Sequence, residues 1–416
     1  MSEAQTLWQS EVHRQVRALV DGLADDAPAM AFALELPDGE RFQKGTGTPA
    51  FTLRFHGEAA LLAVAAKGHL GLLESYFDGT LDVDGDLGSV FALGFASGFD
   101  QHAPAWNRLE NGIHELRHSN ASIEHAKANA RAHYGLGADF YRLWLDEPSM
   151  MYTCGYWPEG TRTLEQAQRN KIDHVCRKLR LKAGERFVDI GCGFGGFMFR
   201  ALETTGACGV GVNTTTEQVR WLQGEIARRG LADRLEVREA DFREVHATYD
   251  KVVSIGVLEH AGRDQLAAVI RAHADFLKPG GIGLLHFIGH VGHFETELFI
   301  RKHVFPGGWI PSLADVVVEL ERCGLEVVDV ENLRRHYAPT LDAWAERFDR
   351  RWDEIHRLDP SRFDERFRRI WRCYLIGCAQ MFRAPSGYTH LFQIVFSKGL
   401  VTPSSYPMSR EFLDAR

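Results

Sequence analysis

The pattern of apolar and polar positions predicts an α/β protein over most of the chain. From about residue 181 onward, short apolar runs typical of strands alternate with amphipathic stretches such as Glu217–Arg229 and Gln265–Leu277, which predict helices. This alternation predicts an open, mostly parallel sheet covered by helices on both faces, with a ligand beyond the carboxyl ends of the strands. The runs that predict strands are Phe187–Ile190, Cys208–Val212, Leu235–Val237, Lys251–Ile255, Ile282–His286, Leu325–Val330 and Leu391–Phe396.

The first part of the chain has a different pattern. Met30–Leu36 and Phe51–Phe55 predict strands, and the apolar stretch Ala59–Leu73 predicts a helix. Glycine and aspartate spacing in Ser75–Asp86 is typical of turns. The polar segment Glu115–Ala132 predicts one connecting helix with a domain boundary inside it. We therefore predict a smaller N-terminal accessory domain over residues 1–122, which serves membrane or subunit docking, and a catalytic domain over residues 123–416.

Composition narrows the class of protein. The chain has 416 residues, of which 45% are hydrophobic and 25% charged, the balance of a soluble globular protein. Its formal net charge of -8 argues against nucleic-acid binding, which calls for a basic stripe, but leaves room for a local basic or apolar patch. The seven scattered cysteines form no C-x-x-C pair, and Met1 opens a polar segment rather than a signal peptide. These features predict a cytoplasmic protein without a disulfide framework.

The segment Val188–Gly196 is the central candidate for cofactor binding. Gly191, Gly193 and Gly196 satisfy the pattern G-x-G-x-x-G, in which glycines let the backbone turn sharply and approach a ligand closely. This pattern alone also fits a nicotinamide or flavin cofactor. Asp189 stands just before the first glycine, where it can organise the loop and meet an ammonium group directly or through water.

Two further signals change this picture. Glu239–Phe242 ends the third predicted strand, where Asp241 can accept from an adenine amino group and Phe242 can cover the base. Leu277–Gly281 is a turn that feeds the fifth strand. Together with the glycine segment, these signals resemble the motif set of class I S-adenosylmethionine-dependent methyltransferases. The resemblance implies a Rossmann-like fold with a seven-stranded sheet and S-adenosylmethionine as cofactor.

One position departs from that motif set. An acidic residue commonly ends the second strand and holds the ribose hydroxyls, but this chain has Asn213 there, with Gln218 about one turn further on. An amide can still donate and accept, although without charge assistance. Asn213 can equally cap the helix that starts near Thr215, and the two roles are compatible.

Several segments outside the nucleotide-binding motifs share a more specific pattern. They are His133–Tyr141, Met151–Trp157, Thr163–Gln168, Ser254–His260, Leu284–Gly289, Lys302–Gly308 and His336–Tyr337. Together they resemble the cyclopropane fatty acid synthase family, which includes the mycolic acid cyclopropane synthases. The resemblance extends from about residue 125 to about residue 400, and the N-terminal portion resembles the accessory domain of the phospholipid-acting members more loosely.

The resemblance implies transfer of a methyl(ene) group from S-adenosylmethionine to the double bond of an unsaturated acyl chain of a membrane phospholipid, giving a cyclopropane. A double bond is a poor nucleophile, so the methyl sulfonium must be held against it in a dry, apolar cavity. Methyl transfer leaves a carbocation, which needs nearby negative or π density and then a base. In the family, a bound bicarbonate is that base.

The family's residues map onto this chain as two sets. The bicarbonate cradle corresponds to Cys154, Glu259, His286, the backbone of Ile288 and Tyr337. The cofactor set adds Tyr152 and Thr153 to the residues already named. The family usually has Asp and Asn where this chain has Gly135 and Ala138, so the loop that closes over the cofactor has lost polar anchors. Phe194 replaces the more usual Trp in the glycine segment, which is a mild change.

Three alternatives to this function remain open from sequence. The same cation can end in a methylene or methyl branch, the protein can be a small-molecule N- or C-methyltransferase, or it can bind lipid without turnover. His286, His290 and His293 invite a metal site, but their spacing puts them on no single strand face, so no metal is predicted. The resemblance further implies a homodimer that associates peripherally and transiently with the inner membrane surface.

Overall fold

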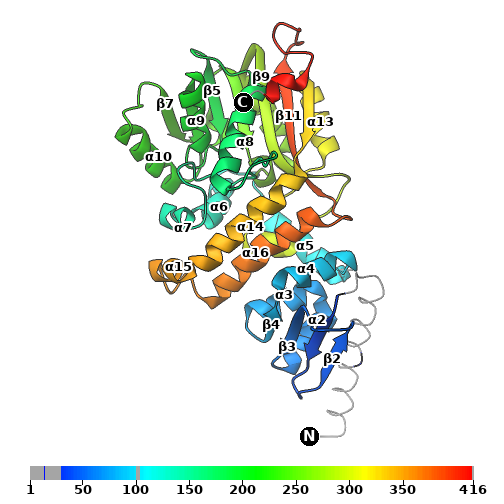
Figure 1. The fold of residues 1–416 in the computed structure, drawn as a ribbon. Coiled ribbons are helices and arrows are strands. Elements are labelled where there is room, and N and C mark those ends of the chain that lie inside the picture. The colour runs from blue at the N-terminus through cyan, green and yellow to red at the C-terminus, as the bar shows by residue number, and fades with distance from the viewer. Residues whose placement is uncertain (1–13, 15–29, 100–103, 415–416) are drawn as a thin grey trace. The chain divides into compact units, whose positions relative to one another are not determined.

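The computed structural model describes residue 14, residues 30–99 and residues 104–414; the polar segment that begins at Met1 lies outside the described residues. The chain divides into two compact units (Figure 1). Unit 1 comprises Met1–Leu116, Glu297–Val304 and Trp352–Gly387, and unit 2 comprises Arg117–Thr296, Phe305–Arg351 and Tyr388–Arg416. The first segment of unit 1 ends at Leu116, near the predicted boundary after residue 122. The other two segments of unit 1 were predicted to belong to the catalytic domain.

Unit 2 is built on a seven-stranded sheet with the order β10-β11-β9-β8-β5-β6-β7. The strands from β5 to β9 pair in parallel with one another, and β11 runs antiparallel to β9 and β10. Each of the seven predicted runs lies in one of these strands, so the mostly parallel sheet is confirmed. The strands are β5 (Arg186–Ile190), β6 (Cys208–Asn213), β7 (Leu235–Glu239), β8 (Tyr249–Ile255), β9 (Leu277–His290), β10 (Leu325–Asn332) and β11 (Thr389–Lys398).

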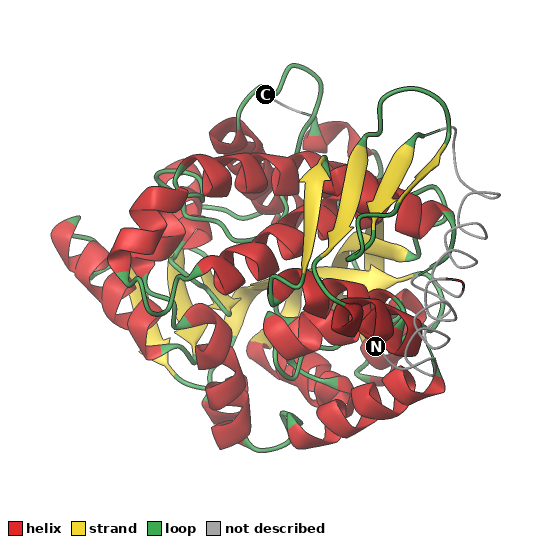
Figure 2. Ribbon diagram, turned by 90° about the horizontal axis from the view of Figure 1, so that it is seen from below, coloured by secondary structure: helices red, strands yellow, loops and turns green. Residues whose placement is uncertain are grey.

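Helices cover both faces of this sheet, as predicted. Successive strand residues point to opposite faces, and Val252 and Val253 accordingly belong to different core clusters. One cluster contains Ile270 of α11, and the other contains Leu222 of α10. Figure 2 distinguishes the helices, in red, from the strands, in yellow. The helices of unit 2 are α6 (Ile123–Tyr134), α7 (Ala138–Arg142), α8 (Leu164–Leu179), α9 (Gly196–Thr205), α10 (Thr216–Arg228), α11 (Leu266–Phe276), α13 (Leu313–Arg322) and α14 (Arg334–Arg350).

The strand order reverses between β5 and β8. The chain runs outward from β5 to β6 and β7, and then crosses to β8 on the other side of β5. The register pairs Ile190 with both Val212 and Ser254, so these strands end at one edge of the sheet. In doubly wound sheets this edge is where ligands bind. The loops after β5, β6, β7 and β8 therefore meet there.

Unit 1 contains a second, four-stranded sheet with the order β2-β1-β3-β4, in which only β1 and β3 are parallel. Its strands are β1 (Phe32–Glu35), β2 (Arg41–Lys44), β3 (Phe51–Phe55) and β4 (Leu81–Gly85). Its helices are α2 (Glu58–Lys67), α3 (His69–Phe77), α4 (Leu87–Ala96), α5 (Ala105–Arg117), α12 (Leu298–His303), α15 (Trp352–Leu358) and α16 (Glu365–Arg383). In the described part of the chain, no helix of either unit is long and apolar enough to cross a membrane.

Three local predictions in the first part of the chain were wrong. The segment Ser75–Asp86, predicted to form turns, contains strand β4, which pairs with β3. Asp84 of β4 forms a 2.7 Å salt bridge with Arg54 of β3, so the alternating acidic residues belong to a half-exposed strand. The helix predicted over Ala59–Leu73 breaks at Gly68, which has a φ of +60°. The single connecting helix is two helices, because Ser122 caps the start of α6 by accepting from the His125 amide.

Candidate active site

The glycine segment forms the turn between β5 and α9, as the sequence predicts. Gly191 and Gly193 have φ angles of +71° and +52°, which other residues rarely adopt. A Cβ atom on Gly191 would lie 2.5 Å from Val257, whereas one on Gly193 would meet no heavy atom of the structure within 4 Å. Gly193 therefore borders open space at the sheet edge where a ligand is expected. Burial raises the pKa of Asp189, at the end of β5, to about 8.

Asn213 ends β6 and makes hydrogen bonds at the start of α10, and its role with the ribose hydroxyls stays a prediction. The Oδ1 atom of Asn213 accepts from the Thr215 amide at 3.0 Å, at the start of α10. Its Nδ2 atom donates to Oε1 of Gln218 at 2.9 Å. These two bonds fix the Asn213 amide just before Thr215, the N-cap residue of α10, and Gln218 lies beside it. The Ala240 amide donates to the Asn213 carbonyl at 3.1 Å, so the ends of β6 and β7 are adjacent.

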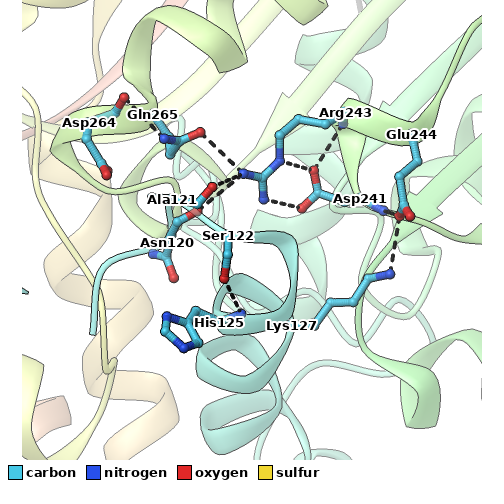
Figure 3. A network of polar contacts seen from close by, with 10 residues as sticks. All are labelled: Asn120, Ala121, Ser122, His125, Lys127, Asp241, Arg243, Glu244, Asp264 and Gln265. Carbon is cyan, nitrogen blue, oxygen red and sulfur yellow. Dashed lines mark hydrogen bonds and ion pairs between the residues drawn. The ribbon is translucent and has the colours of Figure 1, made fainter. Parts of the chain in front are cut away.

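Asp241, predicted to meet adenine, is held by a residue that the sequence analysis missed (Figure 3). Arg243 donates from Nε to Oδ1 of Asp241 at 2.7 Å and from Nη2 to Oδ2 at 2.9 Å. Its Nη1 atom donates to the carbonyl oxygens of Ala121 and Asn120 at 3.0 and 3.3 Å. This forked pairing fixes the carboxylate while leaving it lone pairs for another donor. The guanidinium carbon also lies 5.2 Å from the ring centroid of Phe242.

We predict that Arg243→Met weakens S-adenosylmethionine binding about 10-fold, with kcat within twofold, because the Asp241 carboxylate loses two charge-assisted donors. Steady-state kinetics and calorimetry measure both effects. Arg238→Met is the matched control, because Arg238 makes the same forked pairing with Glu236 at 2.6 and 3.0 Å on β7. Equal effects of the two substitutions would show that Arg243 has no special part in cofactor binding.

The candidate base site is assembled by the pairing of β8 with β9. His286 and Ile288 are two residues apart on β9, so their side chains point to one face. The Ile288 amide donates to Oε1 of Glu259 at 2.6 Å, which shows that this amide is engaged by the glutamate. Burial raises the pKa of Glu259 to about 7, so the carboxyl is substantially protonated at neutral pH.

Two buried polar atoms at this site have no hydrogen-bond partner in the described part of the chain. They are Nε2 of His286 and Oε2 of Glu259. Nδ1 of His286 lies 3.1 Å from Nε2 of Gln393; because an amide nitrogen donates, the imidazole accepts there and carries its hydrogen on Nε2. Burial lowers the pKa of His286 well below its usual value, which keeps the ring neutral. Buried donors without partners are costly, so these atoms fit a small polar ligand.

Cys154 and Tyr337 are brought to the same side by Thr340. The Gly155 amide and the Trp157 indole donate to Oγ1 of Thr340 at 3.1 and 2.9 Å. Thr340 lies three residues after Tyr337 on α14, and residues at that spacing share a helix face. Burial raises the pKa of Cys154 far above its usual value, so it is a thiol that donates, at 3.1 Å, to the Gly155 carbonyl.

Lys171 connects the cofactor candidates with the base candidates. Its fully buried ammonium donates to Oγ1 of Thr153 at 2.8 Å. Burial lowers the pKa of Lys171, and the nearby carboxyl groups of Asp146 and Asp189 oppose that shift. The same ammonium contributes to the lowered pKa of His286. Lys171 was not among the residues singled out from the sequence; the available signal was a lysine among the apolar positions of the segment that forms α8.

An aromatic cluster surrounds Tyr152. Its ring centroid lies 5.5 Å from His133, 5.1 Å from Trp144 and 5.3 Å from Trp344. The hydroxyl of Tyr134 lies 2.7 Å from Nε2 of His260. Such a cluster excludes water and presents π density to a cation.

The three histidines considered as metal ligands have separate partners. His290 lies on β9 with its ring 5.3 Å from Tyr388, and Nε2 of His293 lies 3.1 Å from Asp315. Within residues 30–99 and 104–414, no group of three or more His, Cys, Asp or Glu side chains is arranged to hold a metal ion.

The sheet order, the glycine turn after β5 and the adjacent ends of β6 and β7 define a class I S-adenosylmethionine-dependent methyltransferase. The family model "Mycolic acid cyclopropane synthetase" matches residues 121–394. The chain belongs to this family, which confirms the resemblance found in the sequence motifs.

Individual members of known sequence or structure are similar to this chain over most of their own length. A Pseudomonas putida protein described as "Probable fatty acid methyltransferase" is 34% identical over 88% of this chain and 91% of its own. The cyclopropane-fatty-acyl-phospholipid synthase of Escherichia coli K12 is 34% identical over 81% of this chain and 85% of its own length. The solved structure of mycolic acid cyclopropane synthase CmaA1, complexed with SAH and CTAB, is 32% identical in sequence. The match covers 65% of this chain and 97% of that one, with a TM-score of 0.60.

Proposed function

We propose that the protein transfers a methylene group from S-adenosylmethionine to the double bond of an unsaturated acyl chain of a membrane phospholipid, giving a cyclopropane. The observation that carries the proposal is the pair of buried, unpartnered polar atoms on Glu259 and His286, in a chain of this family. Relatives named for acyl-phospholipid and mycolic acid substrates support the lipid class. We further propose that the protein is a homodimer that associates peripherally with the cytoplasmic face of the inner membrane.

The residues at the sheet edge fit S-adenosylmethionine. The open side of Gly193 leaves room for backbone approach, and the buried Asp189 offers a carboxyl for the ammonium group. Asn213 and Gln218 offer amide groups to the ribose hydroxyls, and Asp241 with Phe242 would receive the adenine. Tyr152 and Thr153 would close the other side. When bound, the cofactor supplies an electrophilic methyl group.

The aromatic cluster around Tyr152 serves the cation that methyl transfer leaves on the acyl chain. Its rings exclude water, which would otherwise add to the cation, and their faces stabilise positive charge. His133, Tyr152 and Trp344 belong to this cluster. An apolar acyl chain is a suitable occupant of such surroundings, whereas a small polar acceptor would lose its hydration there.

The base site fits bicarbonate, which when bound supplies the general base for proton removal. The neutral His286 donates from Nε2 and the Tyr337 hydroxyl can donate, whereas the Cys154 thiol, which donates to the Gly155 carbonyl, would line the site without donating to the anion. A protonated Glu259 donates from Oε2 while its Oε1 atom is held by the Ile288 amide. In this arrangement Ile288 acts through Glu259 rather than on the anion directly.

We predict that bicarbonate activation weakens as the pH rises through about 7, the raised pKa of Glu259. Below that pH the carboxyl is neutral and donates to the anion; above it the carboxylate repels the anion. The bicarbonate concentration for half-maximal rate therefore rises toward 10-fold per pH unit. Glu259→Gln keeps an acceptor for Ile288 and a permanent donor, so its profile is flat. Steady-state rates measured from about pH 6 to about pH 8.5 give this dependence for both proteins. If the bicarbonate requirement changes with pH in the same way in both, Glu259 is not the titrating group.

The proposed reaction is tested with purified protein, S-adenosylmethionine and vesicles of monounsaturated phospholipid. Mass spectrometry of the released acyl chains is expected to show a gain of one CH2, and proton NMR to show cyclopropane signals. Vinylidene or methyl-branch signals would identify the branched product instead. Methylation of amine acceptors alone, or lipid binding without turnover, would overturn the proposal.

A further inference from the structure

Helix α5 of unit 1 presents an apolar face to solvent. Trp106, Leu109, Ile113 and Leu116 are 60%, 53%, 39% and 81% exposed. Their spacing of three, four and three residues places them along one side of the helix. Large exposed residues elsewhere, such as Leu400 and Met408, stand outside helices and strands and need no special account.

The opposite side of α5 is polar and packs into unit 1. Asn107 and Asn111 are buried; Nδ2 of Asn107 donates to the Lys67 carbonyl at 2.9 Å, and Oδ1 of Asn111 accepts from Arg301 at 2.8 Å. A helix of a water-soluble domain normally buries its apolar face and exposes its polar one. In α5 this arrangement is inverted.

The charges of α5 divide in the same way. The acidic residues turn toward unit 1, since Glu110 lies 3.9 Å from Lys302 and Glu115 lies 3.1 Å from Arg301. The basic residues Arg108 and Arg117 are exposed. At about 100° per residue, Arg117 lies beside Trp106 at one edge of the apolar face, whereas Arg108 lies further round the helix, beside Glu115. The outward surface is therefore apolar with one arginine at its edge and a second exposed arginine further round, although the whole chain is acidic.

We propose that α5 docks the protein on an anionic lipid bilayer, with the helix in the plane of the surface and Trp106, Leu109, Ile113 and Leu116 at the boundary of headgroups and acyl chains. An apolar face with aromatic and aliphatic residues, on a helix that also exposes arginines, is the pattern of an interfacial helix. Anionic headgroups complement Arg108 and Arg117. The inference rests on the proposed function, because an acyl-chain substrate lies in such a bilayer.

The test compares Leu109→Asp/Leu116→Asp with Leu400→Asp/Met408→Asp, a control of residues 86% and 87% exposed. Cosedimentation with vesicles of phosphatidylglycerol and phosphatidylcholine, without S-adenosylmethionine, measures binding alone. The α5 variant is expected to lose at least about 10-fold in vesicle partitioning, and the control less than about twofold. Arg108→Gln is expected to reduce the preference for phosphatidylglycerol. The milder Leu116→Ser, with an unchanged unfolding midpoint, is expected to weaken partitioning in the same direction.

Three results would overturn this inference. The docking role of α5 would be wrong if the folded α5 variant partitioned onto vesicles as the unsubstituted protein does. It would also be wrong if the control variant lost as much vesicle partitioning as the α5 variant. Conversion of a dimer to a monomer by light scattering, with partitioning unchanged, would assign the face to a second copy of the chain. Because vesicle binding is measured without turnover, failure of the docking inference is distinguishable from failure of the proposed reaction: product formation tests the one and partitioning the other.

Discussion

Replacement of His286 by alanine is expected to lower the turnover number by about 10²-fold or more, with S-adenosylmethionine affinity within about twofold. The reason is that the neutral imidazole carries its hydrogen on the buried Nε2 atom, the donor proposed to hold the base. Loss of a positioned base affects the chemical step rather than the binding of the cofactor. Single-turnover rates and calorimetry separate these two quantities.

His290→Ala is the matched control. His290 lies four residues further along β9, is equally buried at 2%, and has Nδ1 3.4 Å from Oγ1 of Thr389. Carbonate removal under inert gas is expected to abolish activity of the unsubstituted protein and of His290→Ala, and added bicarbonate to restore both. His286→Ala is expected to respond weakly. Full activity without carbonate would mean that a side chain, such as Glu259 or His286 itself, is the base.

Replacement of Gly193 by valine is expected to raise the dissociation constant of S-adenosylmethionine at least about 100-fold, because a branched side chain would enter the space that the cofactor occupies. The backbone strain of a β-branched residue at a φ of +52° adds a stability cost of roughly 1–2 kcal/mol. Calorimetric titration of the folded variant measures the affinity.

Gly230→Val separates strain from steric exclusion. Gly230 has a φ of +66°, and a Cβ atom there would also meet no heavy atom within 4 Å, but it follows the end of α10 away from the glycine turn. Both variants are expected to lose similar stability in thermal unfolding, and only Gly193→Val to lose cofactor affinity. Unchanged affinity in folded Gly193→Val would remove the glycine turn from the cofactor site.

The sequence by itself determined the elements whose signals are local. The apolar runs of β5 to β11 gave the sheet because a strand buried by helices on both faces needs consecutive apolar residues. Asp189, Gly191 and Gly193 could be placed at the turn after β5 because a sharp turn requires glycine at that point. Strand β4 escaped the same reasoning, since its pairing with β3 depends on residues such as Arg54, distant in sequence.

Only the tertiary structure decided which distant residues meet. Arg243 reaches the Asn120 carbonyl across 123 positions of sequence, and Lys171 reaches Asp146, Thr153 and Asp189 from the buried side of α8. The segment Trp352–Gly387 joins unit 1, and α5 turns its polar side inward to meet Arg301. Such contacts are selected by packing and by the pairing of buried polar groups, which act between surfaces that only the fold brings together.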